Sequence, residues 1–334
     1  MSPRKTLLIV SSLRRRPFDF STSREISRLV MILVIATRAE SVYTGDDVLR
    51  APGAERRSAA GARIASEAVM TDETLSIEDR ARAVFSARAD MYVASASHLD
   101  PQVLGWLVEL AQPQPGWRML DVATGTGHTA FAFAPYVAEI VGIDLTPRML
   151  AEAEQLAAQQ GVVNVRFVEA DIHELPFDDE TFDDEQFDLV TCRRGAHHFS
   201  DIEEALAEMV RMIKPGGLLL IDDRSVPEDD FVDSIMNRLD WLHDESHVRE
   251  YRPSEWQAML AAAGCQVLTL ETYVRHRPLS SLTERVSPQS VAQIHSILAS
   301  LSPDQHRKLH LEEQAGELYS DHWYVIAAAQ KVSD

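Results

Sequence analysis

The sequence is poor in cysteine, and this scarcity excludes some kinds of site. Its 334 residues include two cysteines, Cys192 and Cys265. They do not form a Cys-x-x-Cys pair, so a zinc ribbon is excluded. Each cysteine lies in an apolar run that is typical of a β-strand. We therefore expect two buried free thiols in a reducing compartment, and we predict a cytoplasmic protein.

The sequence also lacks long apolar runs and has a deficit of basic residues. The longest apolar run, residues 29–36, is far shorter than the ~20 residues that a membrane-spanning helix needs. We therefore expect no stable membrane insertion. There are 32 Lys and Arg residues against 52 Asp and Glu residues, which gives a net charge of −20. This sign argues against a nucleic-acid partner, because such proteins neutralise phosphates with basic side chains.

The charge is unevenly distributed along the chain. Residues 1–69 hold 12 Lys and Arg against 7 Asp and Glu and show no sustained hydrophobic period. We predict that they form a poorly ordered basic extension. Two alternatives stay open: a targeting segment, or sequence that lies upstream of the true start. Residues 70–115 are predicted to form an N-terminal helical cap, because apolar residues recur at helical spacing over 77–89 and 100–111. The sequence leaves the oligomeric state unknown.

Strand-like and helix-like segments alternate in the core, residues 116–334. The predicted strands are residues 118–122, 139–143, 165–169, 187–192, 218–221, 265–274 and 323–330. Their order predicts an α/β fold: a Rossmann-like, seven-stranded, mostly parallel sheet with helices on both faces. Helical insertions at about 227–262 and 279–317 are interpreted as lids. The second of these precedes the last strand, and we expect a helix over 304–317 within it.

One stretch, residues 119–130, has the pattern of a nucleotide-binding loop. An apolar run ends in Asp121-Val-Ala-Thr-Gly125-Thr-Gly127, and a helix-like segment follows. Glycines let a backbone approach a ligand closely, and the start of a helix presents free N–H groups. The spacing formally satisfies the G-x-G-x-x-(G/A) dinucleotide pattern, so an NAD-dependent dehydrogenase is one interpretation.

Acidic residues at the ends of three successive strands favour a different ligand. Asp121 ends the first strand, Asp144 ends the second, and Asp171 follows the third. The carboxyl ends of parallel strands meet at one sheet edge, where ligands bind. A carboxylate beside the glycines would repel a pyrophosphate but would suit an ammonium group. The three acids therefore match a cationic nucleoside without phosphate, and S-adenosylmethionine fits this description.

The segment from Asp121 to Pro215-Gly216-Gly217 resembles the class I S-adenosylmethionine-dependent methyltransferases. The similarity covers roughly residues 80–275, and it is strongest to the branch that includes the ubiquinone and menaquinone C-methyltransferases. The resemblance implies a cofactor site in which Asp121, Ala123, Gly125 and Gly127 hold the methionine and ribose portion and Asp144 binds the ribose hydroxyls. It further implies that Leu145, Met149, Asp171 and Ile172 lie at the adenine and that Arg193 lies beside the cofactor. Ala123 is a departure, because many members have glycine there.

The segment after the fourth predicted strand differs from the quinone enzymes. Those enzymes typically carry an Arg-Asn-Val-like segment, whereas this chain has Arg193-Arg-Gly-Ala-His197-His198-Phe. A neutral imidazole at this place could take a proton from the acceptor, so His197 and His198 are candidate general bases or acceptor contacts. The alternative is a structural role. A metal site with His247 is disfavoured, because adjacent histidines rarely face one ion, and we predict no metal.

Two further groups of residues are ambiguous in the sequence. Asp222 and Asp223 could contact the acceptor or could pair with Arg224. Trp241, Tyr251 and Trp256 could line an aromatic pocket or could belong to the core.

We predict methyl transfer from S-adenosylmethionine to a small organic acceptor, at oxygen, nitrogen or carbon. Two other hypotheses stay open from the sequence. One is the NAD-dependent dehydrogenase, and the other is a catalytically silent protein that binds S-adenosylmethionine.

Overall fold

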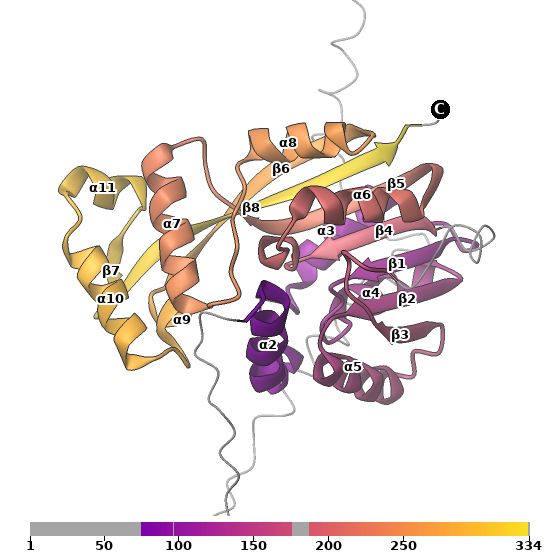
Figure 1. Cartoon of the computed structure of the whole chain (residues 1–334), viewed down its shortest axis with the longest axis horizontal. Coiled ribbons are helices and arrows are strands. Elements are labelled where there is room, and N and C mark those ends of the chain that lie inside the picture. The colour runs from indigo at the N-terminus through magenta and orange to yellow at the C-terminus, as the bar shows by residue number, and fades with distance from the viewer. Residues whose placement is uncertain (1–74, 96, 176–186, 333–334) are drawn as a thin grey trace, which may run out of the picture. The chain divides into compact units, whose positions relative to one another are not determined.

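A single twisted sheet forms the centre of the molecule (Figure 1). The computed structural model describes residues 75–95, 97–175 and 187–332. The strands are β1 (Arg118–Val122), β2 (Glu139–Asp144), β3 (Val165–Glu169), β4 (Phe187–Arg193), β5 (Ile213–Ser225), β6 (Cys265–Pro278), β7 (Glu312–Gln314) and β8 (Glu317–Lys331). Their order is β3-β2-β1-β4-β5-β8-β6, with β7 paired to β8 beside this path. The first five strands are parallel, and β8 is antiparallel to both of its neighbours.

The predicted α/β class and mostly parallel sheet are therefore confirmed, with one short strand added. The expected helix over 304–317 is wrong. Helix α11 covers only Pro303–Lys308, and the chain then forms the β7–β8 hairpin. Its turn contains Ala315 and Gly316, both at positive φ. A turn of this kind interrupts a helix, and the glycine takes the left-handed conformation without strain.

Helices cover both faces of the sheet, as predicted. The helices are α2 (Ile77–Val93), α3 (Pro101–Ala111), α4 (His128–Phe133), α5 (Pro147–Gln160), α6 (Ile202–Met212), α7 (Asp230–His243), α8 (Pro253–Ala262), α9 (Ser280–Thr283), α10 (Pro288–Ala299) and α11, with short 3-10 turns at Ala134–Tyr136 and Ala196–His198. Leu206 of α6 and Trp256 of α8 belong to the hydrophobic cluster on one face. Leu107 of α3 and Phe133 of α4 belong to the cluster on the other.

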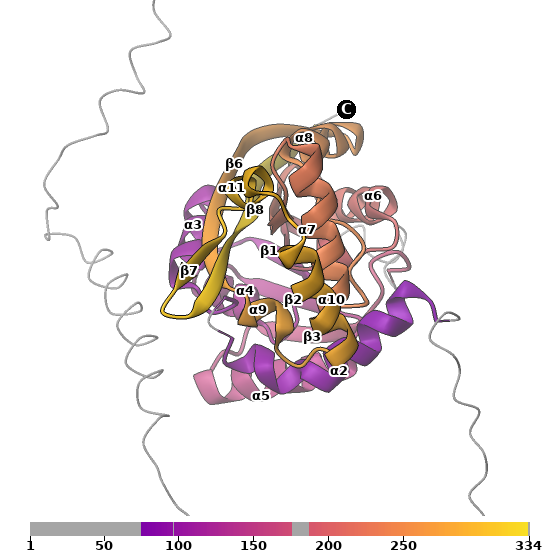
Figure 2. The ribbon, with the colours of Figure 1, turned by 90° about the vertical axis from the view of Figure 1, so that its left-hand side faces the viewer.

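A third hydrophobic cluster lies beyond the end of the sheet. Met236 and Leu239 of α7 pack there with Leu282 of α9 and Ile294 of α10. Figures 1 and 2 show the long strands β6 and β8 running from the sheet into this group of helices. Burial of these apolar side chains gives the group a core of its own, in the part of the chain that the sequence assigns to lids. Helix α8 differs, because Trp256 and Leu260 are buried against the sheet.

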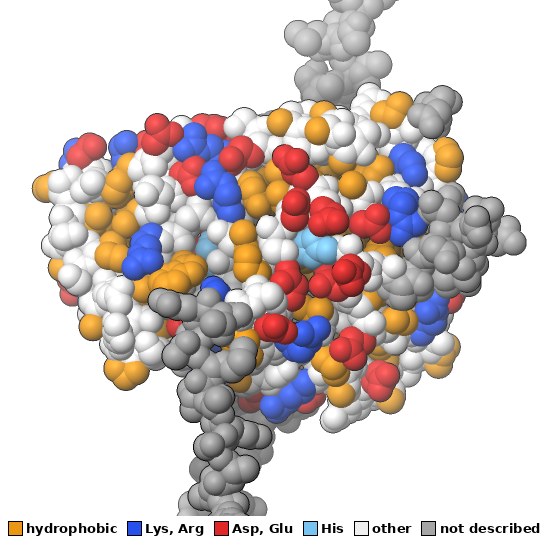
Figure 3. Space-filling model, in the orientation of Figure 1, with side chains coloured by type: hydrophobic (Ala, Val, Ile, Leu, Met, Phe, Trp, Pro, Cys, Tyr) orange, Lys and Arg blue, Asp and Glu red, His pale blue; other side chains and the backbone are white. Residues whose placement is uncertain are grey.

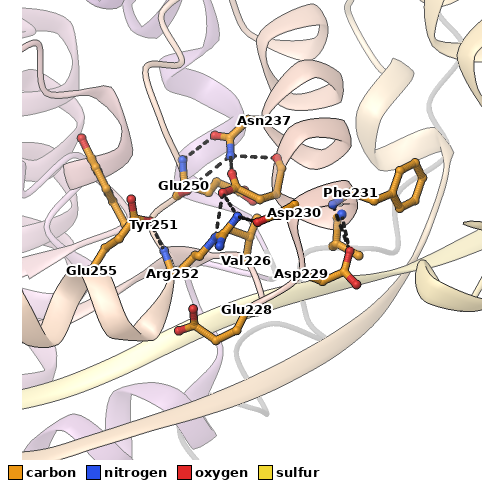
Figure 4. Close-up of polar contacts among 12 residues, drawn as sticks. Val226, Glu228, Asp229, Asp230, Phe231, Asn237, Glu250, Tyr251, Arg252 and Glu255 are labelled. Atoms are coloured by element: carbon orange, nitrogen blue, oxygen red, sulfur yellow. Dashed lines mark hydrogen bonds and ion pairs between the residues drawn. The ribbon is translucent and has the colours of Figure 1, made fainter.

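Polar contacts anchor α7 to the chain that follows it (Figure 4). The side chain of Asp229 accepts hydrogen bonds from the first turn of the helix, at Phe231 and Val232. Asn237 Oδ1 accepts from the backbone N–H of Glu250 at 2.7 Å. Arg252 pairs with Asp233 at 2.8 Å. These contacts fix the segment between α7 and α8, which carries further residues of the site described below.

The surface reflects the acidic composition. On the face shown in Figure 3, Asp and Glu side chains gather across the middle of the molecule. No helix in the described ranges is both long and apolar enough to span a bilayer. Cys192 and Cys265 are buried free thiols, in agreement with the sequence.

Candidate active site

The glycine loop between β1 and α4 has an unusual backbone. Gly125 and Gly127 adopt positive φ, at 54° and 86°. A Cβ atom at Gly127 would lie 2.7 Å from the Phe131 ring, so this position has neither the conformation nor the space for a side chain. Ala123 also has a positive φ, 51°, although it carries a Cβ. A Cβ at Gly195 would lie 2.5 Å from that of Ala123, so the glycine makes room for the alanine methyl group.

Asp121 lies beneath this loop and is almost completely buried. Both carboxylate oxygens accept hydrogen bonds from hydroxyls, from Thr191 at 2.6 Å and from Thr124 at 2.7 Å. Burial raises the pKa of Asp121 to about 6, although the two threonines act in the opposite direction. The carboxylate is therefore ionised at neutral pH, in a setting that favours a nearby positive charge.

Asp144 at the end of β2 ties the loop to the sheet. It accepts a hydrogen bond from the backbone N–H of Gly125 at 2.8 Å and another from that of Thr146 at 2.9 Å. Burial raises its pKa, and the two backbone donors limit this rise. The position of Asp144 therefore depends on the loop conformation that the glycines permit.

Asp171 has a more open environment than the other two acids. Its side chain accepts from His173 Nδ1 at 2.8 Å and from the backbone N–H of the same residue at 2.9 Å. The histidine contact lowers the pKa of Asp171 and raises that of His173. Both residues line the cavity described next.

A first cavity of about 950 Å³, partly open to solvent, lies over the carboxyl ends of β1, β2 and β3. Eight of the ten cofactor residues predicted from the sequence line it: Ala123, Gly125, Asp144, Leu145, Met149, Asp171, Ile172 and Arg193. Asp121 and Gly127 do not line it. Asp121 lies behind Thr124, with which it is hydrogen-bonded, and Gly127 forms the N-cap of α4.

The N-terminal helix α2 forms part of the wall, and the sequence did not reveal this. Glu78, Ala81 and Phe85 line the first cavity. The periodicity predicts the helix but carries no information about its partner. Arg148 of α5 donates a hydrogen bond to the backbone oxygen of Ser86 at 2.9 Å, and this contact holds α2 beside the sheet.

Arg193 and Arg194 at the end of β4 converge on one buried acid. Arg193 Nε lies 3.2 Å and Arg194 Nε 3.1 Å from Asp222 Oδ2. Arg193 also donates to the backbone oxygens of Ser97 and His98, which fixes the segment between α2 and α3. Asp222 is therefore a structural partner for two arginines inside β5.

His197 forms a dyad with Asp223. Its Nδ1 lies 2.5 Å from Asp223 Oδ1, and its backbone N–H donates to Oδ2 at 3.1 Å. Burial alone would raise the pKa of Asp223, but His197, the backbone N–H of Arg224 and the charge of Arg194 together outweigh burial and hold this pKa below its usual value. Nδ1–H donates to the carboxylate, so Nε2 keeps a free lone pair. The described residues include no hydrogen-bond partner for Nε2.

His198 has different surroundings. Its Nδ1 lies 3.1 Å from both the backbone oxygen and the hydroxyl of Ser246, and its ring contacts that of Phe85 edge-on. Burial, with a smaller effect of His197, lowers the pKa of His198 to about 4. This imidazole is therefore uncharged at neutral pH.

A second cavity of about 1390 Å³, also partly open to solvent, adjoins the first. The two cavities share Phe85, Tyr92, His98, Arg194 and His198. His197 and His247 line only the second cavity. Burial lowers the pKa of His247 to about 3. Of the residues left ambiguous by the sequence, Trp241, Tyr251 and Trp256 line neither cavity, and Arg224 pairs with Asp240 and Glu250 instead of Asp222 or Asp223.

Comparison with known proteins identifies the class. Residues 120–221 match the methyltransferase domain family. The uncharacterized methyltransferase YcgJ of Bacillus subtilis is 43% identical over 178 residues, which are 53% of this chain and 68% of that protein. This chain therefore belongs to the class I S-adenosylmethionine-dependent methyltransferases. Its cofactor is S-adenosylmethionine, and the NAD-dependent dehydrogenase hypothesis is rejected.

Two solved structures share the fold over 69% of this chain. One is a Bacillus halodurans protein described as a candidate methyltransferase, with 30% identity, a TM-score of 0.65 and 99% of its length covered. The other is YcgJ from Bacillus subtilis, with 34% identity, a TM-score of 0.62 and 98% covered. The ubiquinone/menaquinone methyltransferase UbiE of Ectopseudomonas mendocina is 40% identical, but over 36% of this chain and 46% of its own length. The chain thus spans about half of that relative.

The residues around the first cavity fit this cofactor. Asp144 and Asp171 in the wall of this cavity offer acceptors for hydroxyl and amino groups. Asp121, which lies behind the wall, is an ionised buried acid whose charge favours a nearby ammonium group. Within the described ranges, no group of three or more His, Cys, Asp or Glu side chains is arranged to hold a metal ion.

Proposed function

We propose that the protein methylates a small organic acceptor held in the second cavity, with His197 as the general base. The observation that carries this proposal is the Asp223–His197 dyad in the wall of that cavity. When bound, S-adenosylmethionine supplies a methyl group activated by its sulfonium. The ten residues predicted from the sequence would hold the cofactor, either in the wall of the first cavity or, for Asp121 and Gly127, just behind it.

The residues that border both cavities indicate the roles of the side chains in this reaction. Phe85, Tyr92 and His198 border both cavities, so groups bound on the two sides meet there. Asp223 orients the His197 ring and stabilises the imidazolium that forms when Nε2 takes a proton. The acceptor therefore carries a dissociable proton on the atom that is methylated. His198 has a contact role, because its Nδ1 is occupied and its ring packs on Phe85.

The surrounding elements wall the acceptor site on several sides. Asp240 and His243 of α7 and Ser281 and Leu282 of α9 line the second cavity. We propose that the insertions at 227–262 and 279–317 cover the acceptor through these helices, and that the cap at 70–115 covers the cofactor through α2. Exclusion of water and alignment of the reacting groups are major sources of rate in methyl transfer.

Labelled S-adenosylmethionine tests the reaction. Purified protein is incubated with a metabolite extract, and labelled products are identified by mass spectrometry. We expect a labelled small molecule, and we expect His197→Asn to reduce kcat by about 100- to 10,000-fold, the usual contribution of a general base. His198→Asn should mainly raise KM, because this residue borders both bound groups.

Two controls make the result decisive. Affinity for S-adenosylhomocysteine must be unchanged in His197→Asn, which shows that the variant is folded. If His197→Asn and Asp223→Asn both keep wild-type kcat, the base assignment is wrong. If S-adenosylhomocysteine binds but no extract yields a labelled product, the protein is a silent cofactor-binding protein.

A further inference from the structure

The acidic residues in the wall of the second cavity are matched by arginines. Arg224 lies 2.5 Å from Asp240 and 2.5 Å from Glu250. Arg88 lies 3.3 Å from Asp244. Burial raises the pKa of Glu250 well above its usual value, so Glu250 is held in its neutral form, and the two arginines match the charges of Asp240 and Asp244. These buried acids therefore do not call for a cationic ligand.

Arg277 in the same wall has no such partner. It lies near the end of β6, and the one hydrogen bond of its side chain among the described residues is a long one, 3.4 Å from Nη1 to the hydroxyl of Tyr324. No ion pair joins it to a described carboxylate. Glu284 also lines this cavity, but its side chain is exposed at the rim. A guanidinium has five N–H donors in a planar fork, so most of those of Arg277 are available to a ligand.

Unsatisfied buried groups lie in the same wall. His322 is 1% exposed, and neither of its ring nitrogens has a hydrogen-bond partner among the residues that the structure describes. The hydroxyl of Ser281 is also buried without a partner. Buried polar atoms in folded proteins nearly always have partners, so two such groups in one cavity wall indicate a missing ligand.

The register of two neighbouring strands places Arg277 and His322 on the same face of the sheet. Strands β6 and β8 are antiparallel neighbours, with Arg277 opposite Ser320 and Arg275 opposite His322. Residues paired in this way, and those two further along, point to the same face of the sheet. Burial lowers the pKa of His322 well below its usual value, and the positive charges of Arg224 and Arg277 act in the same direction. His322 is thus a neutral donor close to these guanidinium groups.

We propose that the methyl acceptor carries an anionic group, a carboxylate or a phosphate, which binds Arg277 beside His322 and Ser281. This inference rests on the proposed function, because it assigns the second cavity to the acceptor. The guanidinium makes two parallel hydrogen bonds to the oxygens of the anion. One ring N–H of His322 and the hydroxyl of Ser281 supply further donors. Phe85, Tyr92 and Leu282 in the same wall provide an apolar surface for the rest of the molecule.

Binding of small aromatic probes tests the anion site without knowledge of the acceptor. Benzoate, phenyl phosphate and the neutral benzyl alcohol are titrated by calorimetry into full-length protein saturated with S-adenosylhomocysteine. We expect at least one of the two anions to bind and benzyl alcohol to bind about 10-fold more weakly or not at all. The stronger of the two anions identifies a carboxylate or a phosphate as the preferred group.

Variants locate the binding of these probes. Arg277→Gln should weaken binding of the anion by about 10- to 100-fold, and Arg277→Lys should restore part of it, since charge is kept but the fork is lost. Arg307→Gln is the control, because Arg307 is 71% exposed, lies outside the wall of the second cavity and pairs with the exposed Asp304. Unchanged binding of S-adenosylhomocysteine shows that each variant is folded. Equal affinity for anions and alcohol, no binding of either anion, or anion affinity unaffected by Arg277→Gln overturns the proposal.

The labelled products of the extract experiment give an independent test. We expect the labelled product to be retained by an anion-exchange resin at pH 7, and its yield at low acceptor concentration to fall in Arg277→Gln but not in Arg307→Gln. A labelled product that is not retained contradicts the anionic acceptor but leaves the methyltransferase function standing. The absence of any labelled product contradicts the proposed function, and the probe titrations then decide the anion site alone.

Discussion

Asp121 is a buried carboxylate whose lost hydration is replaced only in part. Two threonine hydroxyls satisfy its oxygens, yet burial still raises its pKa to about 6. Threonine hydroxyls carry no charge, so they compensate the lost hydration of the anion only in part. A cation bound nearby would complete the compensation. Cofactor binding and ionisation of Asp121 should therefore be coupled.

This coupling predicts that cofactor affinity depends on pH. An ammonium group favours the ionised form, so binding below pH 6 must displace a proton, and affinity should fall by up to about 10-fold per pH unit below that value. Calorimetric titration of S-adenosylhomocysteine between pH 5 and 8 measures this dependence. Asp121→Asn should bind more weakly at pH 8 and should lose the dependence. A constant affinity between pH 5 and 8 in the wild-type protein would contradict the coupling.

Ala123 and Gly195 are a second pair whose effects should be coupled. Ala123 has positive φ, and its Cβ occupies the space that a Cβ at Gly195 would need. Gly195→Ala should therefore lower the free energy of unfolding by about 1–3 kcal/mol, the usual cost of overpacking. In the double variant with Ala123→Gly most of this loss should be recovered, because the opposing methyl group is gone and the left-handed conformation becomes unstrained. Urea unfolding of all four proteins measures the coupling, and strictly additive effects would show that the two sites do not compete for space.

At the scale of elements, helix α2 is held beside the rest of the protein largely by polar contacts. Only Ala81 and Ala89 of this helix are fully buried. Arg88 reaches Asp244 and the backbone oxygen of His243, and Arg148 reaches the backbone of α2 from α5. Small alanine side chains bury little apolar area, so these contacts contribute much of what holds α2 in place. Segments with few buried apolar contacts open more readily than the core.

Ligand binding should therefore stabilise α2 more than distant helices. Glu78, Ala81 and Phe85 line the first cavity, so a bound cofactor adds contacts that opening of α2 would break. Hydrogen exchange of the amides in α2 should slow by up to about 100-fold at a saturating concentration of S-adenosylhomocysteine. Exchange in α10, which contributes no residue to the first cavity, serves as the control. Equal changes in α2 and α10 would mean that α2 does not close over the cofactor.

At the scale of the described part of the molecule, the order of the strands in the sheet determines where the first cavity lies. β1 has β2 on one side and β4 on the other, so the chain reverses its direction of progress across the sheet at β1. The loops after neighbouring strands diverge at such a point and leave a crevice. The first cavity occupies this crevice. The second is lined by residues of helices α7 and α9 and of the parts of β6 and β8 that extend beyond the parallel strands. Apart from the five residues that they share, the two cavities are thus built by different parts of the chain.

The predicted extension over residues 1–69 lies outside the described residues. The two lid insertions remain a proposal, and the structure gives them distinct local settings. α7, α9 and α10 share a hydrophobic cluster, whereas α8 packs on the sheet. The sequence could not separate these cases, because an amphipathic pattern shows that a helix has a buried face but not which surface buries it.

The sequence by itself determined the fold class and the order of the main strands along the chain, and it favoured S-adenosylmethionine over NAD as the cofactor. Alternating strand and helix patterns, the glycine loop and acids at three strand ends are local signals, and each is legible within a few residues. Only the tertiary structure decided which distant residues these local features contact. The pairing of His197 with Asp223 joins residues 26 positions apart. The position of Arg277 on the same sheet face as His322, without an ion-pair partner in the described part of the chain, follows from the register of two strands. Such relations arise from packing of distant segments, and no local pattern records them.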